Sequence, residues 1–425
     1  FGSSGVKLIH PRCPVHLPSP KAHPTLYPSA GSKSHFAAMS DSEHEHEEVT
    51  DLSNQEVTTK YRTCGEISQK ALQKVIEACV PDADLTDLCE LGDSIINEAT
   101  GKLYNKKTKD GKKIEKGVAL PTSITVNEFM GYHSPLKQES QKLKAGDVCK
   151  IDLAVHIDGY ITGAAHTLVV GGEKVEDRRA DAITAAYLCA EAALRQVQVG
   201  NSNLPITETF GKICDDFKCK PVQGVRSHQL KKHVIHGNKS ILGVETQDEK
   251  NEEFTFEANE VYSIDVMVST GEGKGKETEL RTTVFKRALD QTYILKTQKA
   301  RQFISEVNKR FPSLPFSIRA FEDEQVARIG ISEARRHSLL EEYPVLKEKE
   351  GEFTAQFKFT VLLLPGGSKK ITGFPIDLEK DVKSSLSVSD EEIKKLLATS
   401  ATTTSKKKAK KKTAKDDKTE EAEEK

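Results

Sequence analysis

Two short apolar segments that lie far apart in the chain share one arrangement of side chains. Residues 150–155 and residues 263–268 are each rich in β-branched and other apolar residues, and each holds one aspartate at the same relative place. Such a composition is typical of a strand in a protein core. The repetition indicates a duplicated architecture in which Asp152 and Asp265 converge. By itself this repeated pattern suggests a duplication but does not identify the fold.

The composition limits the class of protein and says little about its partners. The chain has 425 residues, of which 36% are hydrophobic and 30% charged. This favours a globular body that carries highly charged, unfolded segments. The 63 basic and 64 acidic residues nearly cancel, so only local charge can indicate a partner. No run of about 18 apolar residues occurs, so we expect no transmembrane helix and no membrane partner.

The eight cysteines do not form a metal-binding or disulfide pattern. None forms a CxxC pair, and Cys214 and Cys219 are spaced wrongly for a zinc knuckle. Three others, Cys79, Cys89 and Cys189, fall inside apolar patterns. We therefore expect buried, structural thiols in a reducing compartment.

Apolar periodicity predicts the main secondary-structure elements. Helices are expected from about residue 61 to Pro81 and over residues 86–100, 178–197, 297–311 and 327–340. Strands are expected over residues 148–155, 164–170, 261–268 and 353–364. The sequence therefore predicts that the ordered part of the chain contains both helices and strands.

Composition divides the chain into four parts. We expect a disordered N-terminal extension over 1–57, of which 1–38 is rich in Pro, Ser and His and precedes a native start at Met39. A transit peptide is the alternative for 1–38, although its repeated prolines oppose an amphipathic helix. The main domain is expected over 58–285 and 350–378, with a helical insert over 286–349. Residues 379–425 are expected to form a disordered tail, because its lysine and glutamate blocks repel themselves.

Six motifs follow one another in the main domain. They are Leu120-Pro121-Thr122-Ser123, Tyr132-His133-Ser134-Pro135, Lys150-Ile151-Asp152, Ser227-His228-Gln229, Val234-Ile235-His236-Gly237 and Ser269-Thr270-Gly271-Glu272-Gly273. In order and spacing, the motifs resemble those of the type-two methionine aminopeptidases across about residues 58–378. Residues 227–231, 319–324 and 348–359, together with the lysine-rich tail, are more similar to the proliferation-associated (ErbB-receptor-binding) family, a non-catalytic branch of that superfamily.

The resemblance implies a fold and a place for a metal site. The fold is the pita-bread α/β (α+β) fold, with two pseudo-symmetric halves of curved antiparallel sheet covered by helices. Aminopeptidases of this fold bind two divalent metals with two Asp, one His and two Glu. The matching positions in this chain are Asp152, Gly163, His228, Asp265 and Lys358.

These five positions no longer suit two metal ions. Gly163 has no ligand atom, and Lys358 brings a positive charge into a site meant for cations. Two carboxylates and one ammonium give a charge of about −1, where two dications need about −4. We therefore expect no metal, no cofactor and no catalysis, with Lys358 paired to Asp152 or Asp265. A single weak metal held by Asp152, His228 and Asp265 is the alternative.

The resemblance also implies two substrate-handling histidines. One matches His236, and the other falls on Tyr132 or on its neighbour His133. No Ser-His-Asp or Cys-His arrangement offers a substitute chemistry. We therefore predict a vestigial pocket that could hold a peptide or an N-terminus without hydrolysing it.

If the protein has no catalytic activity, its function depends on its surface, and we consider the basic clusters first. The predicted RNA- and ribosome-binding residues are Lys406, Lys407, Lys408, Lys410, Lys411 and Lys412 in the tail, and Lys299, Arg301, Lys309, Arg310, Arg335 and Arg336 in the insert. The lysines of the 102–116 loop form a further basic patch. Such clusters attract phosphates in a salt-dependent way. No motif with stacking aromatics is present, so base-specific readout is not expected.

The resemblance implies a non-catalytic protein that binds RNA and ribosomes. Its expected partners are the large ribosomal subunit, rRNA and other structured RNA, in ribosome biogenesis, rRNA processing, translation regulation and growth control. The implied locations are the cytoplasm, nucleus and nucleolus, and we expect a monomer. The alternatives are a protein-interaction scaffold, such as a transcriptional cofactor or receptor-tail binder without RNA, and a residual metalloaminopeptidase.

Overall fold

The computed structural model describes residues 49–108, 111–172 and 174–401. Its α-helices are α1 (Gln55–Ala78), α2 (Leu85–Gly101), α3 (Arg178–Gln196), α4 (Leu204–Asp216), α5 (Gln298–Arg310), α6 (Glu324–Arg336) and α7 (Glu391–Ala398). Two short 3-10 helices are η1 (Lys137–Glu139) and η2 (Ile318–Ala320). In the part of the chain described, no helix is long and apolar enough to cross a membrane.

The main sheet has nine strands. They are β1 (Lys116–Val126), β3 (Val148–Ile157), β4 (Tyr160–Val169), β5 (Lys220–Pro221), β6 (Arg226–Leu230), β7 (Ser240–Leu242), β8 (Val261–Ser269), β14 (Thr354–Leu364) and β15 (Gly367–Lys370). Their order is β1-β3-β4-β14-β8-β6-β7, with β15 beside β14 and β5 beside β8, and all the pairs are antiparallel. The two echoing segments, in β3 and β8, therefore flank the central pair β4 and β14 from either side. This arrangement confirms the predicted duplication.

One row of residues crosses the middle of this sheet. Asp152 on β3 lies opposite Ala165 on β4, Ala165 lies opposite Lys358 on β14, and Lys358 lies opposite Asp265 on β8. Directly opposed residues of antiparallel strands project from the same face. All four side chains therefore share one face, and the small Ala165 leaves space between Asp152 and Lys358.

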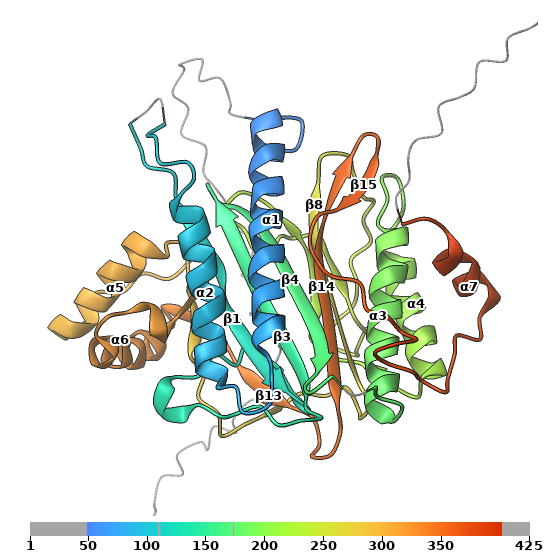
Figure 1. The fold of residues 1–425 in the computed structure, drawn as a ribbon. Coiled ribbons are helices and arrows are strands. Elements are labelled where there is room, and N and C mark those ends of the chain that lie inside the picture. The colour runs from blue at the N-terminus through green and yellow to red at the C-terminus, as the bar shows by residue number, and fades with distance from the viewer. Residues whose placement is uncertain (1–48, 109–110, 173, 402–425) are drawn as a thin grey trace, which may run out of the picture.

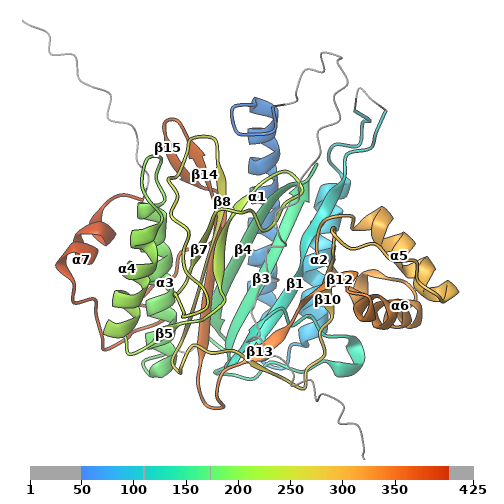
Figure 2. The ribbon, with the colours of Figure 1, turned by 180° about the vertical axis from the view of Figure 1, so that it is seen from behind.

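Helices cover the opposite face of the sheet in two groups (Figures 1 and 2). α1 and α2 pack on β1, β3 and β4, and α3 packs on β8 and β14. α3 is rich in buried alanines, and short side chains let a helix approach a sheet closely. Seven cysteines lie in the described part of the chain, and all seven are buried and free, as predicted; Cys13 lies outside it.

The predicted disorder at both ends of the main domain is wrong in part. In place of disorder from residue 379, the chain forms α7, and Val382, Val388 and Ile393 are buried in the cluster around α3. In place of disorder up to residue 57, α1 begins at Gln55, and Leu52 and Val57 are buried. These few apolar residues stand singly among charged ones and give no periodic signal. The lysine block 406–412 lies outside the described residues.

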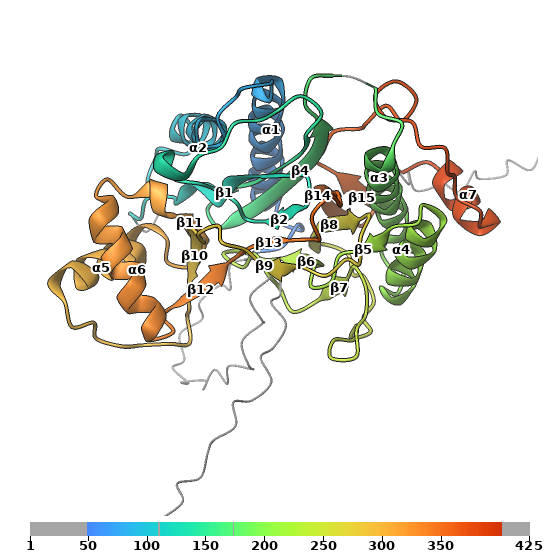
Figure 3. The same ribbon diagram turned by 90° about the horizontal axis from the view of Figure 1, so that it is seen from below.

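The insert contains strands in addition to the two helices that the sequence predicts for it. β10 (Val284–Arg287), β11 (Phe316–Ser317) and β12 (Leu340–Tyr343) form a small sheet against which α5 and α6 pack. The chain returns to the body through β13 (Val345–Lys347), which pairs with β2 (Phe129–Gly131) and β9 (Lys276–Glu277). Figure 3 shows the insert at one end of the molecule, opposite α7.

Candidate functional site

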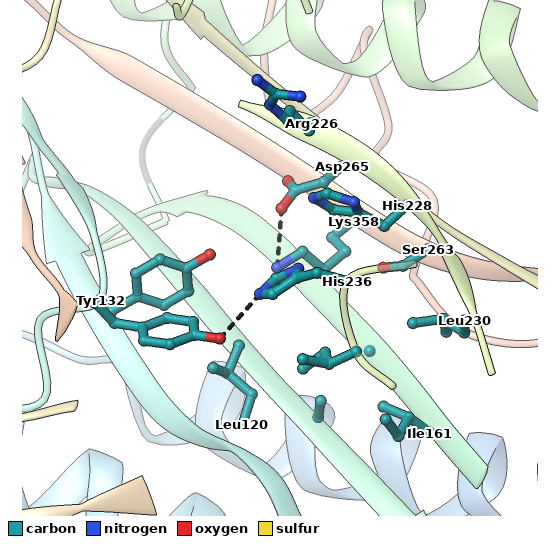
Figure 4. A pocket seen from close by; sticks show the side chains of 14 residues that line it. Leu120, Tyr132, Ile161, Arg226, His228, Leu230, His236, Ser263, Asp265 and Lys358 are labelled. Carbon is teal, nitrogen blue, oxygen red and sulfur yellow. Dashed lines mark hydrogen bonds and ion pairs between the residues drawn. The ribbon is translucent and has the colours of Figure 1, made fainter. Parts of the chain in front are cut away.

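The centre of the candidate site is an ammonium group between two carboxylates. Lys358 Nζ contacts Asp152 Oδ2. It also lies 2.9 Å from Asp265 Oδ2, the contact that Figure 4 marks. Gln356, two residues earlier on β14, donates from Nε2 to Asp265 Oδ1 at 2.8 Å and to Asp152 Oδ2 at 3.4 Å. The side chains of Lys358, Asp152 and Asp265 are 7%, 4% and 1% exposed, so water does little to screen them.

Burial and pairing act in opposite directions on these groups. Burial disfavours the Lys358 ammonium, but Asp152 and Asp265 outweigh it and hold its pKa above the usual value. Burial raises the pKa of Asp152, Lys358 opposes the rise, and Asp265 adds to it, so that this pKa is about 6. The lysine is therefore charged throughout the physiological range and neutralises part of the buried negative charge.

The residues present do not fit a pair of metal ions. Position 163, where the resemblance places a ligand, is a glycine whose added Cβ would lie 3.4 Å from Lys358 Cδ. The Lys358 side chain thus occupies the space into which a metal-ligating side chain at position 163 would project. Its ammonium contacts the carboxylate oxygens of Asp152 and Asp265. Among the described residues, no group of three or more His, Cys, Asp or Glu side chains is placed to hold a metal. A single metal on Asp152, His228 and Asp265 would meet the same ammonium.

Tyr132 and His133 lie differently with respect to the pocket. Tyr132 lines the cavity, together with His228 and His236. The His133 ring instead has Nδ1 3.2 Å from the backbone oxygen of Ile124, and it is not part of the lining. Of the two candidates, Tyr132 is therefore the one that faces the pocket.

The two pocket histidines are held as neutral groups. Their ring centroids are 4.7 Å apart, and His236 Nε2 lies 2.9 Å from Tyr343 Oη. Burial lowers the pKa of His228 to about 4, and it lowers the pKa of His236 well below the usual value. Two uncharged rings beside Lys358 avoid a further positive charge in this space.

The cavity itself is small. Its apolar walls include Leu120, Ile161 and Leu230, and its enclosed space is about 30 Å³. A cavity of that volume has room for one or two water molecules. The pocket as it stands therefore offers little free space, and its binding of a peptide or an N-terminus stays a prediction.

Two members of the site were not predicted. Gln356 bridges the carboxylates, and Tyr343 reaches His236 from β12 of the insert. The two-residue period of a strand places Gln356 on the same face as Lys358, so alternation alone could have indicated it. No pattern in the sequence indicates Tyr343, because its position depends on how the chain returns from the insert.

The basic residues of the insert are exposed at the surface. Lys299, Arg301, Lys309 and Arg310 lie on α5, and Arg335 and Arg336 lie on α6. Two of the six are held by neighbouring carboxylates: Arg310 by Glu306 at 2.5 Å and Arg335 by Glu342 at 2.7 Å. Such exposed pairs contribute little energy, so both arginines remain open to a partner. Their contact with RNA stays a prediction.

Comparisons with known proteins identify the family and the fold. A model of the metallopeptidase family M24 matches residues 59–285. ErbB-3 binding protein 1 of Solanum tuberosum is 45% identical over 361 residues, which cover 85% of this chain and 92% of that protein. Proliferation-associated protein A of Dictyostelium discoideum is 42% identical over 355 residues, which cover 82% and 90%. The solved structure of a thermophilic Arx1 has a TM-score of 0.76 at 30% identity and covers 82% of this chain and 100% of that chain.

The fold and the M24 match define the class as a pita-bread protein of the metallopeptidase superfamily. Within that superfamily, the chain belongs to the family of the ErbB-3-binding and proliferation-associated proteins. Both the predicted fold and the predicted family are therefore confirmed.

Proposed function

We propose that the protein is a non-catalytic member of this superfamily that binds RNA and the large ribosomal subunit. One observation supports the proposed loss of catalysis: the Lys358 ammonium contacts Asp152 and Asp265 where metal ions would lie. Without metal there is no activated water, and the site offers no other nucleophile with a base beside it. The site then acts as a structural link between the halves of the sheet.

The proposal of RNA binding rests on family likeness and on basic surface. Lys299 and Lys309 are exposed on α5, and Lys102, Lys106, Lys107, Lys112 and Lys113 are exposed in the loop after α2. Figures 1 and 2 both place this loop and α5 on the same side of the molecule. Lysines gathered on one side attract a phosphate backbone without reading its sequence. The lysine block 406–412 adds a second anchor and supports a location in the nucleolus as well as in the cytoplasm and nucleus.

Co-sedimentation of the full chain with purified large ribosomal subunits, across a salt series, tests this function. We expect binding that weakens steeply as salt rises. Replacing Lys299 and Lys309 by glutamine, or the lysines of 406–412 by glutamine, should weaken binding. Each phosphate that the variant no longer neutralises should lower the salt slope by about 1.

A matched control lies at the other end of the molecule. Lys394 and Lys395 are exposed on α7, so their replacement by glutamine removes the same charge far from α5. The control variant should bind as the wild type does. Absence of binding even at low salt, or equal weakening in all the variants, would contradict the proposal and favour a scaffold for transcriptional regulators or receptor tails.

A further inference from the structure

The C-terminal helix α7 is held to the body of the protein by few contacts. It has eight residues, and Ile393 is its buried side chain. Val388, just before the helix, is also buried, and both side chains lie in the cluster around α3. Isolated helices of fewer than about 12 residues are barely stable in water. α7 therefore depends on its docking, and a small change at its attachment points decides whether it stays in place.

One attachment point joins Ser389 to the end of α4. The backbone nitrogen of Ser389 donates to Asp216 Oδ2 at 2.8 Å, and Ser389 Oγ donates to Asp216 Oδ1 at 2.6 Å. Hydrogen bonds to a carboxylate are stronger than those between neutral groups. Asp216 is the last residue of α4, so this pair of bonds fixes the start of α7 against that helix. Ser389 is exposed, and residues 383–389 form neither helix nor strand, so an enzyme can reach its hydroxyl.

Three acidic residues directly follow this serine. They are Asp390, Glu391 and Glu392. Both glutamates are exposed. Such a run suits the basic substrate groove of an acidophilic protein kinase, because kinases select substrates by charge pattern. Neighbouring serines lack the run: Ser384 and Ser385 have no acidic residue within the next three positions, and Ser387 has one. The sequence therefore favours Ser389 as the phosphoryl acceptor of this segment.

We propose that Ser389 is a phosphorylation site of an acidophilic protein kinase, and that its modification detaches α7 from α4. In the reaction, Ser389 Oγ bonds to the γ-phosphorus of ATP, the bond from that phosphorus to the bridging oxygen breaks, and ADP leaves. The hydroxyl proton passes to the catalytic aspartate of the kinase. α7 lies at the opposite end of the molecule from the insert, and the proposal does not depend on RNA binding (Figure 3).

A phosphate at Ser389 turns the attraction to Asp216 into repulsion. The hydroxyl donates its hydrogen to the carboxylate, whereas the oxygen of the phosphate ester has none to donate. The phosphate also brings a charge of about −1.5 to −2 at pH 7. Asp216 lies at the C-terminal end of α4, where the helix dipole is negative and disfavours a further anion. Like charges at this attachment point therefore push α7 away from α4.

The surroundings offer the phosphate little compensation. The free amides at the start of α7 are already occupied, because the Asp390 side chain accepts from Glu392 N and Ile393 N. Lys212 of α4 contacts this corner, but it lies 3.4 Å from Asp390 and 3.1 Å from Glu208 and so already serves two carboxylates. A phosphate that captured Lys212 would tighten α7 rather than release it. Measurement of the exposure of α7 distinguishes these two directions.

Phosphorylation of the full chain, followed by hydrogen exchange, tests the proposal. The protein is incubated with ATP and casein kinase 2 as the acidophilic probe kinase, and mass spectrometry locates the phosphate. We expect it on Ser389 in the wild type and in Ser387→Ala, and we expect Ser389→Ala to lose most of it. The amides of α7 should then exchange about tenfold faster, because its docking is lost, while those of β14 keep their rates.

A charge placed without the kinase provides a matched control. Ser389→Asp should also speed exchange in α7, because it sets a carboxylate against Asp216. Ser387→Asp adds the same charge two residues earlier, at an exposed position, and should leave exchange unchanged. The proposal would be overturned by absence of phosphate from Ser389, or by a phosphorylated protein whose α7 exchanges no faster than before. Equal effects of Ser387→Asp and Ser389→Asp would also overturn it.

Discussion

The Nζ atom of Lys358 lies 2.9 Å from Oδ2 of Asp265 and also contacts Asp152, so one side chain joins two carboxylates from opposite halves of the sheet. The three groups stand in a single row across β3, β4, β14 and β8. In the metal-dependent relatives that the resemblance implies, cations would hold such carboxylates together. In this chain the Lys358 ammonium lies between the two carboxylates.

Removing that cation should destabilise the protein strongly. Lys358→Met keeps the length of the side chain but leaves Asp152 and Asp265 buried without a positive partner. Breaking one side of a buried ion pair costs about 3 to 5 kcal/mol. Urea denaturation monitored by circular dichroism should show this decrease in the free energy of unfolding.

The control for this variant is an exposed lysine on β15, the strand that pairs with β14. Lys369→Met on β15 should change the stability by less than about 0.5 kcal/mol. A triple variant with Lys358→Met, Asp152→Asn and Asp265→Asn should recover most of the stability, because it leaves no buried charge. A small effect of Lys358→Met alone would show that the lysine is not a structural link.

A second buried pair fastens the insert to the body. Arg319 of η2 is 7% exposed, and its Nη2 atom lies 3.0 Å from Asp93 Oδ2 on α2 and 2.6 Å from Ser134 Oγ. Arg319→Met should cost about 3 to 5 kcal/mol, because burial already raises the pKa of Asp93 and the variant leaves that carboxylate with the Thr122 amide but without a positive partner. Limited proteolysis should then cut first in the insert. Lys74→Met, which breaks the exposed Lys74–Glu77 pair, should cost less than about 1 kcal/mol and leave the pattern of cuts unchanged.

Buried histidines should make the protein sensitive to acid. Burial, together with Lys370, lowers the pKa of His166 to about 4, and the ring packs against Phe357 and Phe374. The folded pKa lies below the unfolded value of about 6.5, so the neutral ring contributes stability above pH 6.5 that is lost as pH falls toward 4. A shift of that size corresponds to about 3 kcal/mol.

His166→Phe isolates this contribution, because it keeps the ring and removes the titration. The free energy of unfolding, measured from pH 7 to pH 4, should fall by about 3 kcal/mol less in the variant than in the wild type. His156 and His228 have pKa values lowered to about 4 by burial and should keep part of the acid sensitivity. Identical slopes in wild type and variant would mean that His166 is not buried as a neutral group.

The apolar patterns of the sequence predicted the central strands of the main sheet. β3, β8 and β14 each alternate or run apolar over several residues, so their positions follow from burial on one or both faces of a strand. Asp152 and Asp265 could be paired from the sequence because their strands repeat one pattern. That Lys358 serves both at once depends on register across β4 and β14, which no local pattern contains.

Elements held by distant contacts could not be predicted. α7 depends on the burial of Val388 and Ile393 near α3, and α4 was not predicted either. A groove in the insert joins residues of β10, η2 and α6 that gather only when the insert folds. Tertiary packing decides such features, and a charged or weakly periodic segment gives little sign of it.

Metal binding tests the central claim most directly, in the wild type and in a variant with Gly163→Asp and Lys358→Glu. The added Cβ at position 163 has its nearest neighbour at Lys358 Cδ, 3.4 Å away, so the double variant has room for both carboxylates. Calorimetric titration with Mn²⁺ should show no binding to the wild type and measurable binding to the variant, because carboxylates replace a glycine and an ammonium. Stoichiometric metal binding by the wild type, together with release of methionine from a peptide substrate, would contradict the account.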